Sequence, residues 1–159
     1  MTKNGLFALK KEIEKELKDL QRLNEEMVQV LGHKKPSFLE TRAAGSILYD
    51  FYSGIEKIFR RIASKIDRDI PSGEDWHTEL LIRMSIPLDD IRPGVISEGL
   101  KEQLADYLRF RHLFRNIYGF ELKWERCKTL GMMLSRVFSL FQKEIKKFLR
   151  FLDSIQKAM

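Results

Sequence analysis

The chain has 159 residues, 43% hydrophobic and 33% charged, which is long enough for one domain with a proper core and too short for two comfortable ones. Its single cysteine, Cys127, excludes an internal disulfide, and three scattered histidines make no metal-ligand cluster. The net charge of +6 permits a polyanionic partner without requiring one, because most charge at this density is solvated helix surface. No apolar run is long enough to span a membrane. We therefore expect a cytoplasmic protein without metal or cofactor.

The predicted elements at the start of the chain are two long helices. Apolar residues at three- and four-residue spacings predict a first helix over about residues 5–31. After a turn containing Pro36, Ser37 and Glu40 form a capping box that opens a second helix, which ends near Asp67.

Three further helices are predicted in the second half of the chain. A turn-rich joint precedes a short helix over about residues 76–85. Ser97 caps a fourth helix that Gly119 closes, and a fifth starts near Lys123. Neither strand-like alternation nor an internal repeat is visible, so we expect residues 1–159 to form a single all-α domain, an up-and-down bundle of four to five helices.

The fourth predicted helix carries charge where a bundle helix should be apolar. On a helical wheel, Arg115 and Tyr118 lie within about 40° of Arg111 and share an arc with Leu104 and Leu108. Removing a guanidinium from water costs several kcal/mol of hydration free energy, and only a binding partner can compensate for this cost. These arginines therefore need an acid, an interface or a bound phosphate, and we expect the arc to end at a cleft or a two-fold interface.

Glu56 is the best internal partner for one of these arginines. It lies about 40° from Tyr52 on the wheel of the second helix, beside that helix's apolar stripe, and can orient one guanidinium. The other arginine would then be free to face a groove or a symmetry mate, where its planar fork suits a phosphate.

Simpler interpretations account for most other residues. The apolar stripes of the first and last helices suit a coiled-coil adaptor as well as an ordinary bundle, so a purely structural role stays open. His77 opens a short helix, where a lone histidine is typical of a surface or capping residue. Cys127 has no histidine partner in the sequence and is interpreted as a small buried hydrophobe.

The stretch RHLFRNIY resembles the motif of the HEPN superfamily, and most closely that of its HepT-like toxins: Arg, a polar residue, three variable positions, His, one variable position and Tyr. Arg111 falls on the motif arginine, His112 on the polar position and Tyr118 on the tyrosine, whereas Asn116 stands where the family has histidine. The segments YSGIEKIFRRIA, IPSGEDWHTELL, PGVISE and LRFRHLFRNIYGFEL extend the resemblance over about residues 45–125.

The resemblance implies a HEPN-like bundle that forms a homodimer, in which the motif helices of two subunits face each other across a basic cleft. Active members cut RNA without metal: the arginine stabilises the phosphate while the histidine moves protons during attack by the ribose 2′-hydroxyl. By this resemblance Arg111 contacts RNA phosphate, with Arg109 and Arg115 beside it. Such toxins are paired with a minimal nucleotidyltransferase antitoxin, a separate protein that can attach adenylyl groups to the motif tyrosine, here Tyr118.

The asparagine at the histidine position changes the expected chemistry. Asn116 has no useful pKa near neutrality and cannot act as an acid or a base. His112 is the remaining candidate for proton transfer, although it projects about 100° around the helix from Arg111. Tyr118 offers a phenol, and phenols, with an ordinary pKa of about 10, are poor bases.

Three hypotheses follow. The first is a ribonuclease with a rearranged catalytic site built from Arg111, His112, Asn116 and Tyr118, and supported by Glu56 and Tyr52. The second is an inactive member that still binds RNA or nucleotide, and the third is a bundle whose task is to bind its nucleotidyltransferase. We favour the HepT-like toxin, with metal-independent RNA cleavage.

Overall fold

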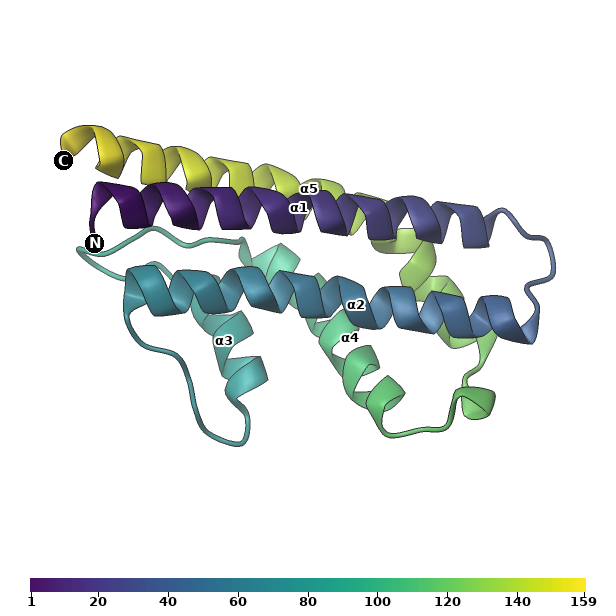
Figure 1. Ribbon diagram of the computed structural model, residues 1–159. Coiled ribbons are helices and arrows are strands. Elements are labelled where there is room, and N and C mark those ends of the chain that lie inside the picture. Colours follow the sequence, from purple (N-terminus) through teal and green to yellow (C-terminus); the bar gives the residue numbers. More distant parts are fainter.

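The structure is a computed structural model that describes all 159 residues. Its five α-helices are α1 (Lys3–Leu31), α2 (Phe38–Ile62), α3 (Trp76–Met84), α4 (Glu98–Arg115) and α5 (Trp124–Ala158). The predicted all-α bundle is confirmed. In Figure 1, α1, α2 and α5 lie along one another, α3 and α4 cover one side, and both termini lie at the same end.

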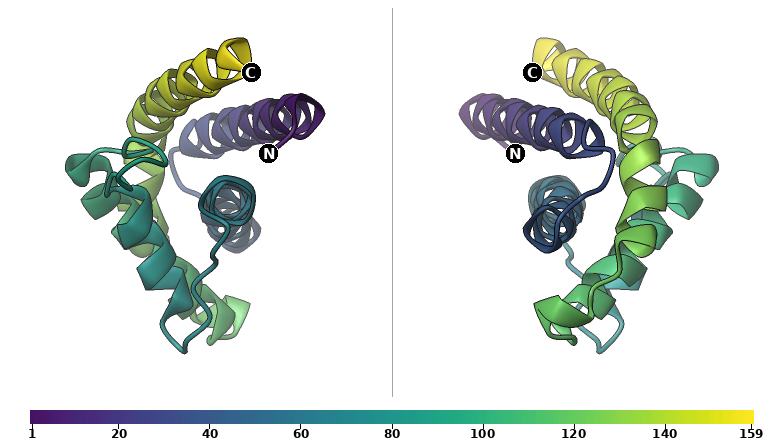
Figure 2. Two further views of the ribbon diagram at one scale, coloured as in Figure 1. Left: turned by 90° about the vertical axis from the view of Figure 1, so that its left-hand side faces the viewer. Right: turned by 90° about the vertical axis from the view of Figure 1, so that its right-hand side faces the viewer.

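Helix α2 is the centre of the bundle and contacts each of the other four helices. Seen end-on in Figure 2, it lies between α1 and the layer formed by α3 and α4. Its inward residues Phe51, Tyr52, Ile55 and Phe59 are fully buried in a core cluster of 35 hydrophobic residues. Each large apolar side chain buried in this way contributes about 1.5 to 3 kcal/mol, so packing fixes the position of α2.

The two ends of α2 follow the sequence closely. Ser37 Oγ accepts a hydrogen bond from the Glu40 amide at 3.1 Å, and Glu40 Oε1 accepts one from the Ser37 amide at 3.0 Å, which is the predicted capping box. At its other end α2 continues into a π-helical turn, Ala63–Asp67. Arg68 then ends the helix in the left-handed conformation, with φ of 57°.

Helix α4 ends earlier than predicted. Its last residue is Arg115, Asn116 is the C-cap, and Gly119 begins a separate 3₁₀ turn, Gly119–Glu121. The Asn116 side chain donates to the carbonyl oxygen of His112 at 2.7 Å, a local bond of the kind that competes with continued helix. The placement of Tyr118 on the apolar arc of the helix is therefore wrong, because the chain has left the helix before this residue.

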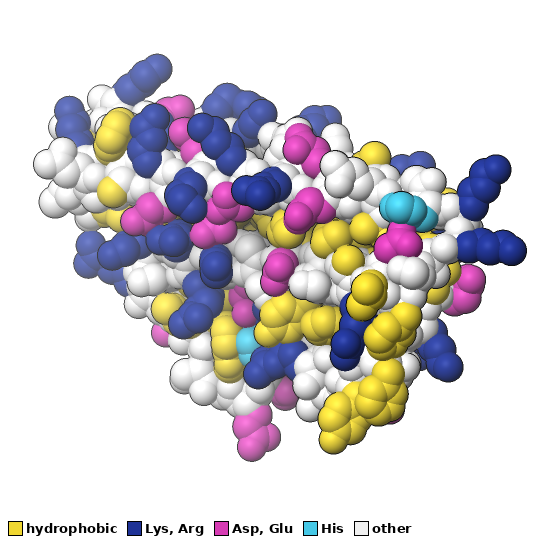
Figure 3. Space-filling model, turned by 45° about the vertical axis from the view of Figure 1, so that its right-hand side comes forward, with side chains coloured by type: hydrophobic (Ala, Val, Ile, Leu, Met, Phe, Trp, Pro, Cys, Tyr) yellow, Lys and Arg dark blue, Asp and Glu magenta, His cyan; other side chains and the backbone are white.

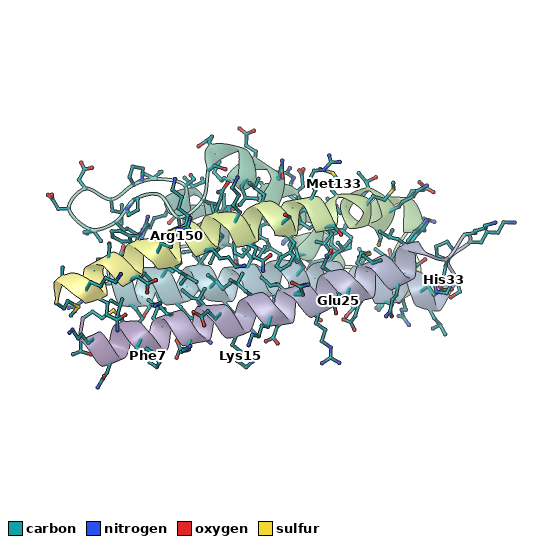
Figure 4. The ribbon with its side chains drawn as sticks, turned by 90° about the horizontal axis from the view of Figure 1, so that it is seen from above. Phe7, Lys15, Glu25, His33, Met133 and Arg150 are labelled. Carbon is teal, nitrogen blue, oxygen red and sulfur yellow. The ribbon has the colours of Figure 1, made fainter.

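The outer surface of α1 is mainly polar. Lys15 and Glu25 project from its outer side in Figure 4, together with the exposed Phe7. None of the five helices combines the length and the apolarity needed to cross a bilayer.

Candidate functional site

Arg111 is buried against α2, where it pairs with Glu56. Its Nη2 donates to Glu56 Oε1 at 3.1 Å and to Oε2 at 3.0 Å, and its Nη1 donates to Ser53 Oγ at 3.3 Å. Only 6% of Arg111 is exposed, so the ion pair is shielded from water. The structure thus brings together the two residues that the helical wheels paired, and the buried guanidinium has the acid it needs.

The Tyr52 ring packs against the Arg111 guanidinium of this ion pair. The Arg111 guanidinium carbon lies 5.0 Å from the centre of the Tyr52 ring, a favourable cation–π arrangement. Burial raises the pKa of the Tyr52 phenol well above its usual range, the Glu56 carboxylate raises it further, and Arg111 lowers it. The phenol stays protonated, so Tyr52 supports the guanidinium and cannot act as a base.

A third element, α3, reaches the ion pair through His77. The His77 Nδ1 lies 2.8 Å from Glu56 Oε2 and 2.9 Å from Arg111 Nη2. The ring stacks on Trp76, with ring centres 3.6 Å apart, and 31% of the His77 side chain is exposed. The interpretation of His77 as a surface or capping residue is wrong, because it completes a cluster of Glu56, Arg111 and His77.

A second buried ion pair lies where the loop after α3 meets the end of the π-helical turn. Arg92, in the loop before α4, donates to the two carboxylate oxygens of Asp67 at 2.6 and 2.8 Å. It also donates to the carbonyl oxygens of Ile86 and Pro93 at 3.0 and 3.1 Å. The side chains of Arg92 and Asp67 are 0% and 2% exposed. This contact ties the loop after α3 to the end of the π-helical turn.

A groove of about 590 Å³ opens beside the cluster, between α3 and α4. The polar residues that line it include Glu74, His77, Arg109, Arg111, His112 and Arg115. Arg111 and Arg115, the two arginines of the predicted arc, therefore both line this groove.

The groove is less basic than its three arginines suggest. Glu74 and Asp75 line it as well, Arg111 is neutralised by Glu56, and Arg109 is paired with Asp106 one turn earlier on α4. Arg115 is exposed and forms no ion pair. It is therefore the free positive charge of the groove.

Two of the predicted site residues lie outside the groove lining. Asn116 is exposed and its side chain is turned back onto its own helix. Tyr118 is 71% exposed and stacks on Phe120, with ring centres 5.2 Å apart. Exposed hydrophobic side chains gather near this turn and the start of α2, on the lower right of Figure 3. The structure therefore separates the Tyr118 phenol from the cluster around Arg111.

Cys127, on α5, is buried in the hydrophobic core of the bundle and is not part of the groove lining. Burial raises the pKa of its thiol to about 11, so the thiolate is scarce at neutral pH. This environment agrees with the interpretation of Cys127 as a small buried hydrophobe.

Comparison with known proteins identifies the family. Residues 43–152 match the family model of HepT-like proteins, which is 110 of the 159 residues and includes the whole groove. No curated protein and no solved structure gives a significant match to the chain. With this match over more than half of its length, the chain belongs to the HepT-like protein family.

Proposed function

We propose that this protein is the toxin of a HepT-type toxin–antitoxin pair and that its groove binds and cuts RNA without a metal ion. The observation that carries the proposal is the meeting of Arg111, two histidines and the unpaired Arg115 along one groove. Guanidinium groups bind phosphate, and imidazoles exchange protons near neutral pH. A purely structural ion pair would need neither the groove nor the second arginine.

Membership of the HepT-like family supports the rest of this proposal. We propose that the protein forms a homodimer in which the two α4 helices face each other, that a minimal nucleotidyltransferase is its antitoxin, and that it acts in the cytoplasm. The groove of a single chain is open to solvent at Arg115, which leaves room for RNA or a second subunit.

The structure suggests different tasks for the two arginines. Arg115 carries the unpaired charge and should attract the RNA backbone. Arg111 is paired with Glu56, whose negative charge offsets its own. Its attraction for a phosphate in the groove is therefore weaker and acts over a shorter distance. Arg109, paired with Asp106, contributes less than Arg115 for the same reason.

RNA cleavage should therefore persist when metal ions are removed, and RNA binding should depend on Arg115. We expect the wild-type protein to cut pooled cellular RNA in EDTA and to leave 2′,3′-cyclic phosphate and 5′-hydroxyl ends. Arg115→Ala should weaken binding to all RNA sequences and reduce the salt dependence of log K by about 0.7, the share of one phosphate contact on a single strand. Binding is measured by fluorescence anisotropy at several salt concentrations.

The matched control is Arg150→Ala, which removes the same charge from an exposed position on α5 (Figure 4). It should leave RNA binding and its salt dependence nearly unchanged. Loss of cleavage in EDTA, restored by a divalent cation, would contradict the metal-free reaction. An equal effect of the two substitutions would show that the groove is not the binding site.

A second candidate function is supported by Tyr118. This residue is 71% exposed on a turn outside the groove lining, where another protein can reach it. A bundle that serves as the binding subunit and adenylylation acceptor of a nucleotidyltransferase needs this exposure and needs no catalytic groove.

Tyr118 should be the acceptor in such a reaction. After incubation with the partner nucleotidyltransferase and ATP, mass spectrometry should find one added adenylyl group on a peptide containing Tyr118. Tyr118→Phe should abolish the modification, whereas Tyr49→Phe, at a partly buried tyrosine, should not. Equal labelling of Tyr118→Phe and wild type would exclude this residue as the acceptor.

If the protein binds RNA but never cuts it, the function is that of an inactive member that binds RNA.

A further inference from the structure

We propose that His77 is the base that accepts the proton of the ribose 2′-hydroxyl, and that Glu56 is the residue that positions it. The inference rests on the proposed RNA cleavage in the groove. It answers a question that the sequence raises, because Asn116 cannot exchange protons and lies outside the groove lining.

Two contacts compete for His77 Nδ1: Arg111 Nη2, which can only donate, lies 2.9 Å away, and Glu56 Oε2, which can only accept, lies 2.8 Å away. Because Nη2 already donates to both Glu56 oxygens, we assign the proton of the neutral ring to Nδ1. A carboxylate has no proton to donate, so the 2.8 Å contact between His77 Nδ1 and Glu56 Oε2 is a hydrogen bond only if Nδ1 carries the proton. In the neutral ring this leaves Nε2 without a proton. A histidine whose Nδ1 donates to a carboxylate is the arrangement that prepares Nε2 to act as a base.

The position of the ring supports the same role. Nδ1 faces inward to Glu56, so Nε2 lies at the opposite end of the ring, and His77 is part of the groove lining. Trp76 stacks against the ring, and Arg60 lies over Trp76 at 5.2 Å from the ring centre. These contacts restrict the ring while 31% of the His77 side chain stays accessible to a substrate.

His112 is less suited to this task, although it lines the same groove. It is exposed, and no side chain binds its ring to fix a tautomer or an orientation. Of the two histidines at the groove, only His77 has a carboxylate behind it.

The proposed step balances without a co-reactant other than water. His77 Nε2 takes the proton of the 2′-hydroxyl as the 2′-oxygen forms a bond to phosphorus. The bond between phosphorus and the 5′-oxygen breaks, and the leaving 5′-oxygen takes a proton from water. His77 then returns its proton to the solvent, and the products are a 2′,3′-cyclic phosphate and a 5′-hydroxyl.

The decisive variant is His77→Gln, because a glutamine amide can still donate to Glu56 but cannot accept the proton. We expect His77→Gln to cut pooled cellular RNA about 100-fold or more slowly than wild type, the usual contribution of a general base. His33 supplies a matched control: its Nδ1 contacts Glu40 Oε2 at the same 2.8 Å, but it lies in the turn between α1 and α2 (Figure 4). His33→Gln should cut at the wild-type rate.

Four readouts separate proton transfer from a merely structural role. His77→Gln should melt close to wild type and bind a 2′-O-methyl RNA, which cannot be cut, with unchanged affinity. In His77→Ala, added imidazole should restore part of the cleavage rate. Independently of any activity, ¹⁵N NMR of the wild-type protein should show the Nδ1–H tautomer for the neutral ring of His77.

These results distinguish the ribonuclease function from the role of His77 as its base. Wild-type protein that cuts no RNA overturns the ribonuclease function and this inference together. Wild-type activity that His77→Gln retains overturns the inference alone, as does an Nε2–H tautomer. If His112→Gln abolishes cleavage while His77→Gln does not, His112 is the base.

Discussion

Replacing Arg111 with methionine is expected to destabilise the fold by about 3 to 5 kcal/mol, because it leaves Glu56 buried without its cation. Methionine keeps most of the aliphatic stem of the arginine, so the loss reports the charge, its hydrogen bonds and its contact with the Tyr52 ring more than a cavity. For a chain of this size the loss lowers the melting temperature by about 6 to 20 °C. Thermal unfolding followed by circular dichroism measures it.

The double variant Arg111→Met with Glu56→Gln is the control. Removing the carboxylate as well as the guanidinium should recover a large part of the loss, because a neutral amide costs much less to bury than an unpaired charge. A melting temperature of Arg111→Met within about 2 °C of wild type would show that water reaches Glu56 and that the pair is not buried in solution. Both variants should also lose RNA cleavage, since both lack the Arg111 guanidinium at the groove and the double variant also lacks the carboxylate that positions His77.

The architecture could be predicted because each long helix has a continuous apolar stripe. On α2, the spacing of Leu48, Tyr52, Ile55 and Phe59 was sufficient to identify the helix and its inner face, and all four are fully buried. The capping box at Ser37 marked the start of this helix. Such local patterns determine where helices begin and which face they bury.

The Glu56–Arg111 pair could also be predicted, for a related reason. Both residues interrupt an apolar face, and a charge in such a position needs a partner. His77 gave no comparable signal, because it lies 21 residues from Glu56 and 34 from Arg111 and meets them only where α3 docks. Its role depends on tertiary packing that no helical wheel contains.

The end of α4 shows a limit of the helical wheel. The wheel placed Tyr118 beside Arg111 by continuing the helix to Gly119, but the helix ends at Arg115. A side-chain bond from Asn116 to the helix backbone is a local alternative to another turn. The residue that departs from the family motif is thus also the residue at which the helix stops.

The buried pair of Asp67 and Arg92 should be at least as important for stability as the pair at the groove. Asp67→Asn keeps the shape of the side chain but leaves Arg92, whose side chain is 0% exposed, without its counter-ion. We expect a loss of about 3 to 5 kcal/mol, a large part of the 5 to 15 kcal/mol that holds a typical domain folded. Urea unfolding at constant m-value measures the change.

A neighbouring ion pair provides the comparison. Asp69 contacts Arg83 at 2.9 Å, but the Asp69 side chain is 73% exposed, so Asp69→Asn should cost less than about 1 kcal/mol. The two substitutions are chemically identical and two residues apart, and they differ in burial. Equal effects would contradict the shielding of Arg92.

The Asp67 pair should also influence the groove, because it holds the segment that carries His77. In Asp67→Asn, below its melting temperature, amide hydrogens of α3 should exchange faster than those of α2, whose core contacts are unchanged. RNA cleavage should fall along with this protection, although Asp67 does not line the groove. If α3 stays fully protected while the protein is destabilised, Asp67 contributes to global stability without positioning His77.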